Sequence, residues 1–366
     1  MNPEPRTVKP QPRILNPILG IETSCDETSA GVVSDGINVL SNIVFSQIAD
    51  HTPYGGVVPE IAARSHVEVL SSVIEEALSV SESTWTDIQA IAVTRGPGLA
   101  SSLLVGVSAA KAIALRLCKP FIGVNHLRAH LHSIFLNQPS FFEEFRSRKT
   151  GPILILLVSG GHTCLVRLTG VNESELLGQT LDDAAGEALD KGARLLDLSY
   201  PGGPAIEKAA KGGNPYSISF PFVPKLKTGS MTGSLNPDFC FSFSGLKTAL
   251  RYYVQNHPEQ GDLKDVCASY QEAVFNMLMD RTTHVLQKEK QITTLACVGG
   301  VARNQLLRSK LKMLADQSGV DLVLTESEFC TDNAAMIAGL GGVCAESGCG
   351  ANIHMDIDPS LGVNDF

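Results

Sequence analysis

The fold is decided by the segment Ile18-Leu19-Gly20-Ile21-Glu22-Thr23-Ser24-Cys25-Asp26-Glu27-Thr28, which begins as an apolar strand and ends in a turn of small and polar residues. Ala30-Gly31-Val32-Val33 is typical of the returning strand. The pattern recurs about 135 residues later, where Ile153-Leu154-Ile155-Leu156-Leu157-Val158 leads through Ser159-Gly160-Gly161-His162-Thr163 into Cys164-Leu165-Val166. Such a repeat indicates a duplicated domain whose two turns face one cleft.

A third small-residue turn follows a later apolar run. Leu295-Ala296-Cys297-Val298 leads into Gly299-Gly300-Val301-Ala302 and then Arg303-Asn304, and the glycines allow the backbone to approach a flat ring or a ribose. Three such turns around two lobes resemble the nucleotide cleft of the actin, hexokinase and seventy-kilodalton chaperone superfamily. We therefore expect an α/β fold with two duplicated actin/hexokinase-like lobes around a nucleotide cleft.

The chain divides into six expected parts. The polar segment from Asn137 to Thr150, with Pro139 and a basic cluster, is the best candidate for a domain boundary. The expected parts are a disordered tail over 1–15, an N-terminal lobe over 16–136, a linker over 137–150, a C-terminal lobe over 151–332, a C-terminal helix over 333–346 that returns towards the N-terminal lobe, and a tail over 347–366.

Composition excludes several classes of function. The net charge of −9 over 366 residues argues against a general nucleic-acid-coating surface, so any RNA binding must be local or shared with a partner. Nine cysteines without a C-x-x-C pair argue against a zinc ribbon and suit reduced thiols in a cytosol-like compartment. No apolar run approaches the roughly 20 residues that span a bilayer, so we expect no membrane.

A histidine pair predicts a metal site. His126 and His130 lie one turn apart on a helix that Asn125 can cap and that follows the apolar run Phe121-Ile122-Gly123-Val124. Nine histidines give roughly 0.2 chance pairs at this spacing, so a bland surface or core pair stays an alternative. A zincin peptidase needs a glutamate base after the first histidine, and Leu127 stands there instead.

Acidic residues supply the other candidate groups. Asp332 is the expected third metal ligand, although the run Thr331-Asp332-Asn333 could equally cap the helix that follows it. Asp26 and Glu27 could polarise water, orient a metal or act as a base, or could merely form a hairpin turn. A helix over 180–191 would present Asp183, Glu187 and Asp190 on one side, either to solvent or to ribose hydroxyls and an amino-acid substrate.

Two further patterns favour packing over chemistry. The glycine turn Arg95-Gly96-Pro97-Gly98-Leu99 precedes a helix of small residues from Ser101 to Leu117, and close packing is the favoured interpretation over a phosphate loop. Phe239, Phe241 and Phe243 alternate as on a strand, which predicts an aromatic core stripe.

Together these motifs resemble those of the tRNA threonylcarbamoyladenosine transferases, the TsaD family. The resemblance runs from about Ile18 to Leu340 and rests on Gly20 to Thr28, Tyr54-Gly55-Gly56-Val57-Val58-Pro59-Glu60, Gly96-Pro97-Gly98-Leu99, the His126/His130 pair, Leu157 to Thr163, Asp182-Asp183-Ala184-Ala185-Gly186-Glu187, Phe243-Ser244-Gly245-Leu246-Lys247-Thr248 and Cys330-Thr331-Asp332-Asn333.

The resemblance implies a reaction and its residues. Members of this family transfer the threonylcarbamoyl group of threonylcarbamoyl-adenylate to the exocyclic amine of the adenosine 3′ of the tRNA anticodon, in tRNAs that read ANN codons, and release AMP. The implied catalytic residue is Glu27, beside which Asp26 is a second candidate base from its place in the same turn. The implied ligands of one divalent metal ion, iron or zinc, are His126, His130 and Asp332. The implied substrate-binding residues are Leu157, Val158, Ser159, Gly160, Gly161, Asp190, Gly203 and Asn304.

The resemblance also implies partners and a compartment. Bacterial members work with a degenerate homologous subunit and a small ATPase, and the expected location is the cytoplasm, with mitochondria or plastids as alternatives. The basic residues expected to contact partners are Arg146, Arg148, Lys149, Lys225 and Lys227.

The chain departs from the family pattern at two positions, and two rival functions stay open. Arg128 stands where an acidic residue is common between the histidines, and Cys240 stands where Asp is common before Phe241-Ser242-Phe243. The rivals are a kinase or chaperone-like ATPase of the same superfamily, which would turn over ATP without tRNA, and a metallopeptidase, which would need a base beside the metal.

Overall fold

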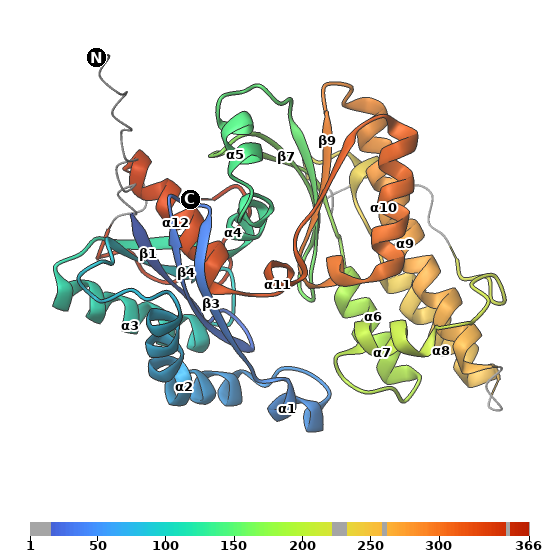
Figure 1. The fold of residues 1–366 in the computed structure, drawn as a ribbon. Helices are drawn as coiled ribbons and strands as arrows, with labels where there is room; N and C mark the ends of the chain where they lie inside the picture. Colours follow the sequence, from blue (N-terminus) through green and yellow to red (C-terminus); the bar gives the residue numbers. More distant parts are fainter. Residues whose placement is uncertain (1–15, 222–232, 258–261, 349–351, 366) are drawn as a thin grey trace, which may run out of the picture.

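The computed structural model describes residues 16–221, 233–257, 262–348 and 352–365. These residues form two lobes, each built on a five-stranded mixed sheet with flanking helices (Figure 1). The tail expected over 1–15 and the basic residues Lys225 and Lys227 lie outside the described residues.

The sheet of the N-terminal lobe has the strand order β3-β2-β1-β4-β5. Its strands are β1 (Pro17–Glu22), β2 (Glu27–Ser34), β3 (Asn38–Ser46), β4 (Ala90–Gly96) and β5 (Phe121–Asn125). The first three strands pair antiparallel, whereas β1, β4 and β5 run parallel to one another. Helices connect the parallel strands, as a crossover requires.

The sheet of the C-terminal lobe repeats this topology strand for strand. Its order is β10-β9-β6-β7-β8, with β6 (Ile153–Val158), β7 (Thr163–Gly170), β8 (Glu173–Gln179), β9 (Thr294–Val298) and β10 (Asp321–Leu324). Again three strands are antiparallel and two continue parallel to the first. The predicted duplication is therefore confirmed, and its two hairpin turns occupy equivalent positions.

Helices cover both faces of the N-terminal sheet. On one face, α2 (Pro59–Val80) and α3 (Ala100–Leu117) pack on side chains such as Leu19 and Ile21. On the other face, α12 (Ala334–Ser347) packs on Ile18 and its neighbours (Figure 1). Alternate residues of a strand point to opposite faces, so one apolar strand serves both layers.

Small residues let α12 lie very close to the sheet. A β-carbon built on Gly20 would stand 2.3 Å from the carbonyl oxygen of Ala334, and one built on Gly341 would stand 2.5 Å from the β-carbon of Ala92. Any larger side chain at either position would push the helix away from the sheet. The last long helix of the chain is therefore part of the core of the N-terminal lobe.

The glycines near α3 also serve close packing, which confirms the favoured interpretation. A β-carbon on Gly98 would stand 2.6 Å from the carbonyl oxygen of Ser24, and one on Gly106 would stand 2.3 Å from Thr23 Oγ1. Among the described helices, α3 is long and apolar enough to cross a membrane by length and composition alone. Its small residues nevertheless pack against β1, β4 and α2, as in the core helix of a globular domain.

The remaining helices complete the two lobes. They are α1 (Ile48–His51), η1 (Thr52–Tyr54), α4 (His126–His132), η2 (Ser133–Phe135), α5 (Pro139–Arg146), α6 (Ala185–Leu195), α7 (Gly202–Ala209), η3 (Pro237–Phe239), α8 (Ser244–Asn256), α9 (Leu263–Lys288), η4 (Gly300–Arg303), α10 (Gln305–Ser318) and α11 (Ser327–Cys330). The expected linker contains α5, because Phe142 and Phe145 bury one face of this short helix.

Two predictions of secondary structure in the C-terminal lobe were wrong, although the predicted burial of three phenylalanines in the core is confirmed. Phe239, Phe241 and Phe243 are buried but share no strand, since Phe239 ends η3 and Phe241 makes a single bridge with Thr180. The helix predicted over 180–191 begins only at Ala185. Asp182 instead accepts hydrogen bonds from the backbone N–H groups of Phe243 (2.8 Å) and Ser244 (3.3 Å), and this holds the preceding residues in a loop.

Candidate active site

The histidine pair lies on α4, directly after β5. The side chain of Asn125 accepts hydrogen bonds from the backbone N–H groups of Leu127 (2.9 Å) and Arg128 (3.2 Å), which confirms it as the N-cap. All seven residues of α4 are buried, and the rings of His126 and His130 lie 4.7 Å apart between centroids. The pair therefore faces one point inside the protein.

Asp332 reaches the same point from the loop between α11 and α12. Its Oδ1 lies 3.1 Å from His130 Nε2 and 3.5 Å from His126 Nε2. Asn333, not Asp332, caps α12, because its side chain accepts a hydrogen bond from the Met336 N–H group at 3.1 Å. One potential ligand atom from each of the three side chains lies within 4.8 Å of the others, so the predicted group is assembled.

The three side chains fit a divalent metal ion. Two imidazole nitrogens and a carboxylate oxygen are donors that first-row metals accept, and three protein ligands leave coordination positions for a substrate. The group joins the lobes, since α4 follows the first sheet and Asp332 follows the second.

Glu22 fixes the orientation of one imidazole and was not predicted as a functional residue. Its Oε2 lies 2.9 Å from His126 Nδ1 and accepts a hydrogen bond from Thr94 Oγ1 at 2.6 Å. Its Oε1 accepts one from the Ser24 N–H group at 2.5 Å. A carboxylate on the far nitrogen of a metal-binding histidine sets its tautomer and raises its basicity. The sequence signal that could have identified Glu22 is its position as a single charged residue at the end of an apolar strand.

Electrostatics in the group follow from burial and opposite charges. Burial alone lowers the pKa of His126, but the carboxylates of Asp332 and Glu22 outweigh it and raise this pKa to about 9. Burial raises the pKa of Asp332, and the two histidines reverse this and hold it below its usual range. Burial also lowers the pKa of His130. Without a metal, a proton on His126 therefore neutralises Asp332.

The first hairpin turn brings two carboxyl groups beside this group. Burial, and then the charges of Asp26 and Asp332, raise the pKa of Glu27 well above its usual value. His66 of α2 holds the turn through two contacts. Its Nδ1 lies 2.7 Å from Thr28 Oγ1, and its Nε2 lies 3.0 Å from the Cys25 carbonyl oxygen. His66 is a second residue that sequence reasoning missed, because a histidine on a buried helix face carries no local signal.

The second hairpin turn presents open backbone. Ser159 closes it by donating its N–H to the His162 carbonyl oxygen at 2.8 Å, and a β-carbon on Gly160 or Gly161 would meet no atom within 4 Å. Burial, followed by the charges of His126 and His130, lowers the pKa of His162 to about 4. The second turn therefore lies within electrostatic reach of the histidine pair.

Asp190 of α6 lies within electrostatic reach of the first turn. It accepts a hydrogen bond from the Gly202 N–H group at 2.7 Å. Burial raises its pKa, the N–H groups of Gly202 and Gly203 partly offset this, and the charge of Asp26 adds to the rise. Asp183 and Glu187, the other two carboxylates predicted on this helix, are ion-paired, because Lys191 contacts Asp183 at 2.8 Å and Glu187 at 2.7 Å.

Three of the predicted substrate residues have clear structural duties. Asn304 caps α10 by accepting hydrogen bonds from Leu306 N (3.0 Å) and Leu307 N (3.2 Å), and it donates to Gln271 Oε1 at 2.9 Å. Leu157 and Val158 are fully buried in the core on either side of β6. Their side chains do not reach an open surface, so only the backbone here is available to a ligand.

The two glycines of the turn after β9 differ in their surroundings, since a β-carbon on Gly300 would meet only Thr331 Cγ2 at 3.9 Å, whereas Gly299 is closely packed. Gly299 has a φ of 94°, and a β-carbon there would stand 2.4 Å from the Val158 carbonyl oxygen. Its missing side chain therefore allows close approach to β6.

The two departures from the family pattern are both buried. Arg128 donates to the carbonyl oxygen of Asn172 at 3.2 Å, and so ties α4 to the hairpin between β7 and β8. Cys240 is fully buried beside η3, with its Sγ 3.5 Å from the Asn236 carbonyl oxygen. Neither residue contacts the metal group in the hydrogen bonds described.

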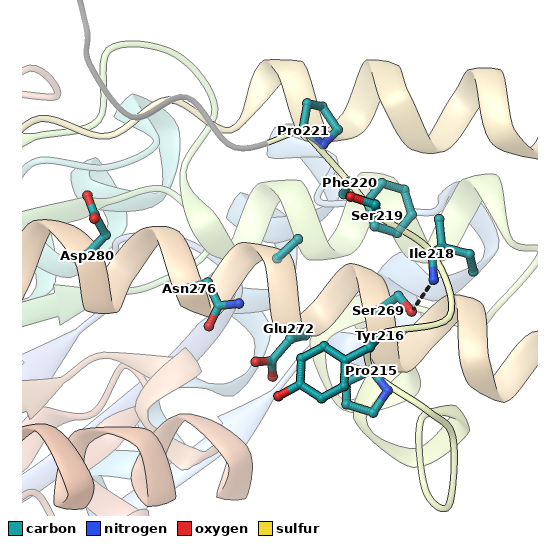
Figure 2. A pocket seen from close by; sticks show the side chains of 11 residues that line it. Pro215, Tyr216, Ile218, Ser219, Phe220, Pro221, Ser269, Glu272, Asn276 and Asp280 are labelled. Carbon is teal, nitrogen blue, oxygen red and sulfur yellow. Dashed lines mark hydrogen bonds between the residues drawn. The ribbon is translucent and has the colours of Figure 1, made fainter.

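Two cavities lie on the C-terminal lobe, and neither is lined by a residue of the metal group. One, of about 530 Å³, lies between the segment 215–221 and α9, and its lining includes Tyr216 from the segment and Glu272 from the helix (Figure 2). The other, of about 640 Å³, is bounded by α7, α9 and the start of α10. No predicted site residue lines either cavity.

Comparison with known proteins gives the family. The family model of tRNA N6-adenosine threonylcarbamoyltransferase, TsaD, matches residues 38–339. The chain is 47% identical over 336 residues to the protein of that name from Geobacter sulfurreducens, covering 90% of this chain and 93% of the relative. It is 45% identical over 348 residues to the one from Symbiobacterium thermophilum, covering 94% and 96%.

Solved structures agree on the fold. Full-length HypF, in a phosphate- and nucleotide-bound form, matches 92% of this chain and 47% of its own with a TM-score of 0.55 at 12% identity. HypF of T. kodakarensis matches 91% and 48% with a TM-score of 0.54 at 16% identity. Because the family model covers most of the chain and the relatives are similar over nearly their whole length, the chain belongs to the tRNA N6-adenosine threonylcarbamoyltransferase family.

Proposed function

We propose that this chain transfers the threonylcarbamoyl group of threonylcarbamoyl-adenylate to the exocyclic amine of the adenosine 3′ of the anticodon in tRNAs that read ANN codons, with release of AMP. The observation that carries the proposal is the convergence of His126, His130 and Asp332 beside Glu27, in a chain of this family. A metallopeptidase would also need a base beside its metal, so membership of this family is what favours transfer over hydrolysis.

The metal group holds the donor. His126, His130 and Asp332 would bind one divalent ion, iron or zinc. When bound, the ion supplies Lewis-acid polarisation of the donor and a fixed point for its carboxylate or hydroxyl. Glu22 keeps His126 aimed at that position through its 2.9 Å contact with Nδ1.

Glu27 assists the attack. An aromatic amine is a poor nucleophile and must lose a proton as the new C–N bond forms. The raised pKa of Glu27, caused first by burial and then by Asp26 and Asp332, brings its carboxylate towards the range in which a general base works best. Asp26 contributes by its charge, because a neighbouring carboxylate increases the proton affinity of Glu27.

The adenylate part of the donor is assigned to the second lobe. The open backbone of Ser159, Gly160 and Gly161 suits phosphate oxygens, and Asp190 with Gly203 suits a ribose. Leu157 and Val158 would contribute backbone only. Asn304 would act by holding the start of α10, since both ends of its side chain are already bonded.

Partners complete the activity. A chain of net charge −9 needs positive surface from elsewhere to hold a tRNA loop, and we propose a degenerate homologous subunit and a small ATPase. Arg146 and Arg148 pair with acidic neighbours, Glu143 and Glu173, which leaves Lys149 as the stronger contact candidate among the described residues. The proposed location is the cytoplasm, with mitochondria or plastids as alternatives.

Reconstitution tests the proposal. The chain is combined with threonine, bicarbonate, ATP, the adenylate-making enzyme, the partner proteins and tRNA, and the nucleosides of the tRNA are then analysed. Appearance of threonylcarbamoyladenosine that depends on this chain supports the transferase. ATP turnover that is independent of tRNA, with no modified nucleoside, would favour the kinase or chaperone-like ATPase, and cleavage of a peptide would favour the metallopeptidase.

A further inference from the structure

Residues 352–365, here named the C-terminal strap, run along the N-terminal lobe after α12. Ile353, Met355 and Ile357 pack at alternate positions against the core cluster under the first sheet. Two backbone hydrogen bonds then join the strap to the end of β4 and the loop that follows it. Asp358 N donates to the carbonyl oxygen of Arg95 in β4 at 2.8 Å, and Gly98 N in the loop donates to the Pro359 carbonyl oxygen at 3.3 Å. The strap is therefore part of the folded lobe.

The end of the strap reaches the helix that carries the histidine pair. Asn125 Nδ2 donates to the carbonyl oxygens of Gly362 at 2.7 Å and Asp365 at 3.0 Å. The carboxylate of Asp365 accepts a hydrogen bond from Gly362 N at 2.7 Å, which closes a turn and presents both carbonyls to Asn125. Val363, which is 5% exposed, belongs to the same apolar cluster as Leu127 of α4.

Asn125 uses both ends of its amide. The oxygen caps α4 at Leu127 and Arg128, and the nitrogen holds the strap. Its two donor hydrogens are matched to two carbonyls, so the side chain has a single satisfied orientation. The residue that follows Asn125 in the chain is His126, so the orientation of this amide bears directly on the first metal ligand.

A helix of seven residues is too short to be stable by itself, so its position depends on its cap and its packing. The strap contributes to both, because it orients Asn125 through the amide nitrogen and adds Val363 to the cluster that holds Leu127. It also follows α12, whose preceding loop supplies Asp332. One C-terminal segment thus provides the third ligand and then returns to orient the other two.

We propose that the C-terminal strap is a positioning element of the metal centre, which holds Asn125 and thereby aims His126 and His130 at Asp332. The inference rests on the metal site of the proposed function. It assigns a positioning role to residues 359–365, which are not among the reacting groups. Metal affinity would then depend on residues far from α4 in the chain, since Asn125 and Gly362 are 237 positions apart.

Two variants of the full chain separate the strap from the cap. Asn125→Ser keeps a hydroxyl oxygen that can cap α4, because serine is a good N-cap, but it is too short to hold Gly362 and Asp365. A chain that ends at Asp358 keeps Asn125 and loses the contacts. Leu314→Ala, a truncation in the core of α10 far from α4, is the stability control.

The probe is Zn²⁺ alone, titrated into metal-free protein in competition with a chromophoric chelator. We expect both variants to bind Zn²⁺ about 10- to 100-fold more weakly, as is usual when the support of a ligand is lost. The combined variant should be no weaker than the weaker single one, because both break one contact. Leu314→Ala should lower the thermal midpoint and leave Zn²⁺ affinity within about threefold.

One result would reject the role of the strap, and another would reject the metal site on which the inference rests. Zn²⁺ affinity within about threefold of the full chain in both variants would reject the strap. Failure of the unaltered chain to bind Zn²⁺, or unchanged binding by His126→Ala, would reject the metal site itself. In that case amide hydrogen exchange of α4 in metal-free protein decides the role of the strap, since exchange at least about tenfold faster in both variants supports it and unchanged exchange overturns it.

Discussion

Glu22 Oε2 lies 2.9 Å from His126 Nδ1, and this contact joins the first strand of the chain to the metal group. The carboxylate is fully buried and has three donors in total, from His126, Thr94 and Ser24. Because His126 donates through Nδ1, Nε2 is the nitrogen that faces Asp332, where it carries the proton in metal-free protein and would offer its lone pair to a metal ion. The geometry of a ligand therefore depends on a residue that touches no metal.

Replacing this carboxylate by its amide tests that dependence. We expect Glu22→Gln to weaken metal binding by about 10- to 100-fold, because the amide neither carries the charge nor fixes the tautomer of His126. Metal affinity is measured by chelator competition, with Glu75→Gln, an exposed carboxyl on α2, as the matched control. Equal affinity in the two variants would remove Glu22 from the metal centre.

Each histidine is expected to be essential for the metal. His126→Ala or His130→Ala removes one of the three proposed protein ligands, so metal content should fall far below one ion per chain and threonylcarbamoyl transfer should be abolished. Elemental analysis after gel filtration gives the metal content, and far-ultraviolet circular dichroism checks that the fold persists. Full metal occupancy in both variants would reject the assignment of ligands.

Metal affinity should depend on pH through His126. Its pKa of about 9 in metal-free protein is raised above the ordinary 6.5, so its protonated form stabilises the fold fully below pH 6.5 and this stabilisation is lost as the pH rises through 9. The same proton competes with the metal. Affinity for Zn²⁺ should therefore increase from pH 6.5 to 9 by up to about tenfold per pH unit and then level off.

Chelator competition at several pH values measures this profile. The thermal midpoint of metal-free protein should fall over the same window, and less so in His126→Gln, which cannot be protonated. A flat Zn²⁺ affinity between pH 6.5 and 9 would show that Asp332 and Glu22 do not hold a proton on His126.

Glu27 should act on the chemical step. Glu27→Gln keeps the shape of the side chain and is expected to slow transfer by about 10²- to 10⁴-fold, the usual contribution of a general base, with little effect on metal content. Since the pKa of Glu27 is raised, its basic form accumulates only at higher pH, and the rate should rise with pH through that pKa. The variant should lose this rise.

Single-turnover transfer from preformed threonylcarbamoyl-adenylate isolates that step. An unchanged rate in Glu27→Gln would mean that the residue only shapes the hairpin turn or repels misplaced phosphate. The exposed Glu75→Gln again serves as the control.

Multiple turnovers should require partner proteins. The acidic chain alone, supplied with purified adenylate and tRNA, is expected to modify at most about one tRNA per chain, because it lacks the positive surface that holds and releases the nucleic acid. The amount of modified nucleoside per chain is counted against time. Sustained turnover by the isolated chain would contradict the partner requirement.

Local signals were sufficient for much of the fold and for α4. The repeated strand and turn at Ile18 and Ile153 predicted two matching sheets, and the strand before Asn125 predicted the cap and the helix that carries His126 and His130. These features depend on residues that are neighbours in sequence. The same logic left Asp332 ambiguous, because a Thr-Asp-Asn run fits a ligand and a cap equally well until Asn333 is seen to be the cap.

Other features depend on contacts that no local pattern encodes. Glu22 meets His126 across 104 residues, and only the register of β1, β4 and β5 brings them together. The alternation of Phe241 and Phe243 suggested a strand, but a strand also needs a partner edge, and a single bridge to Thr180 is all that this segment has. The strap also contains alternating apolar residues, but this run is too short to predict which part of the protein it would pack against.

The position of α12 has a consequence for the order in which the protein is made. The face of β1 that carries Gly20 is completed only by Ala334 and its neighbours, so a nascent chain on the ribosome must extrude both lobes before its first sheet is covered. Translation of more than 300 residues therefore proceeds with an apolar sheet face that invites chaperone binding or aggregation. Premature termination upstream of α12 should yield insoluble fragments, and the C-terminal lobe, whose strands are contiguous between β6 and β10, can fold first.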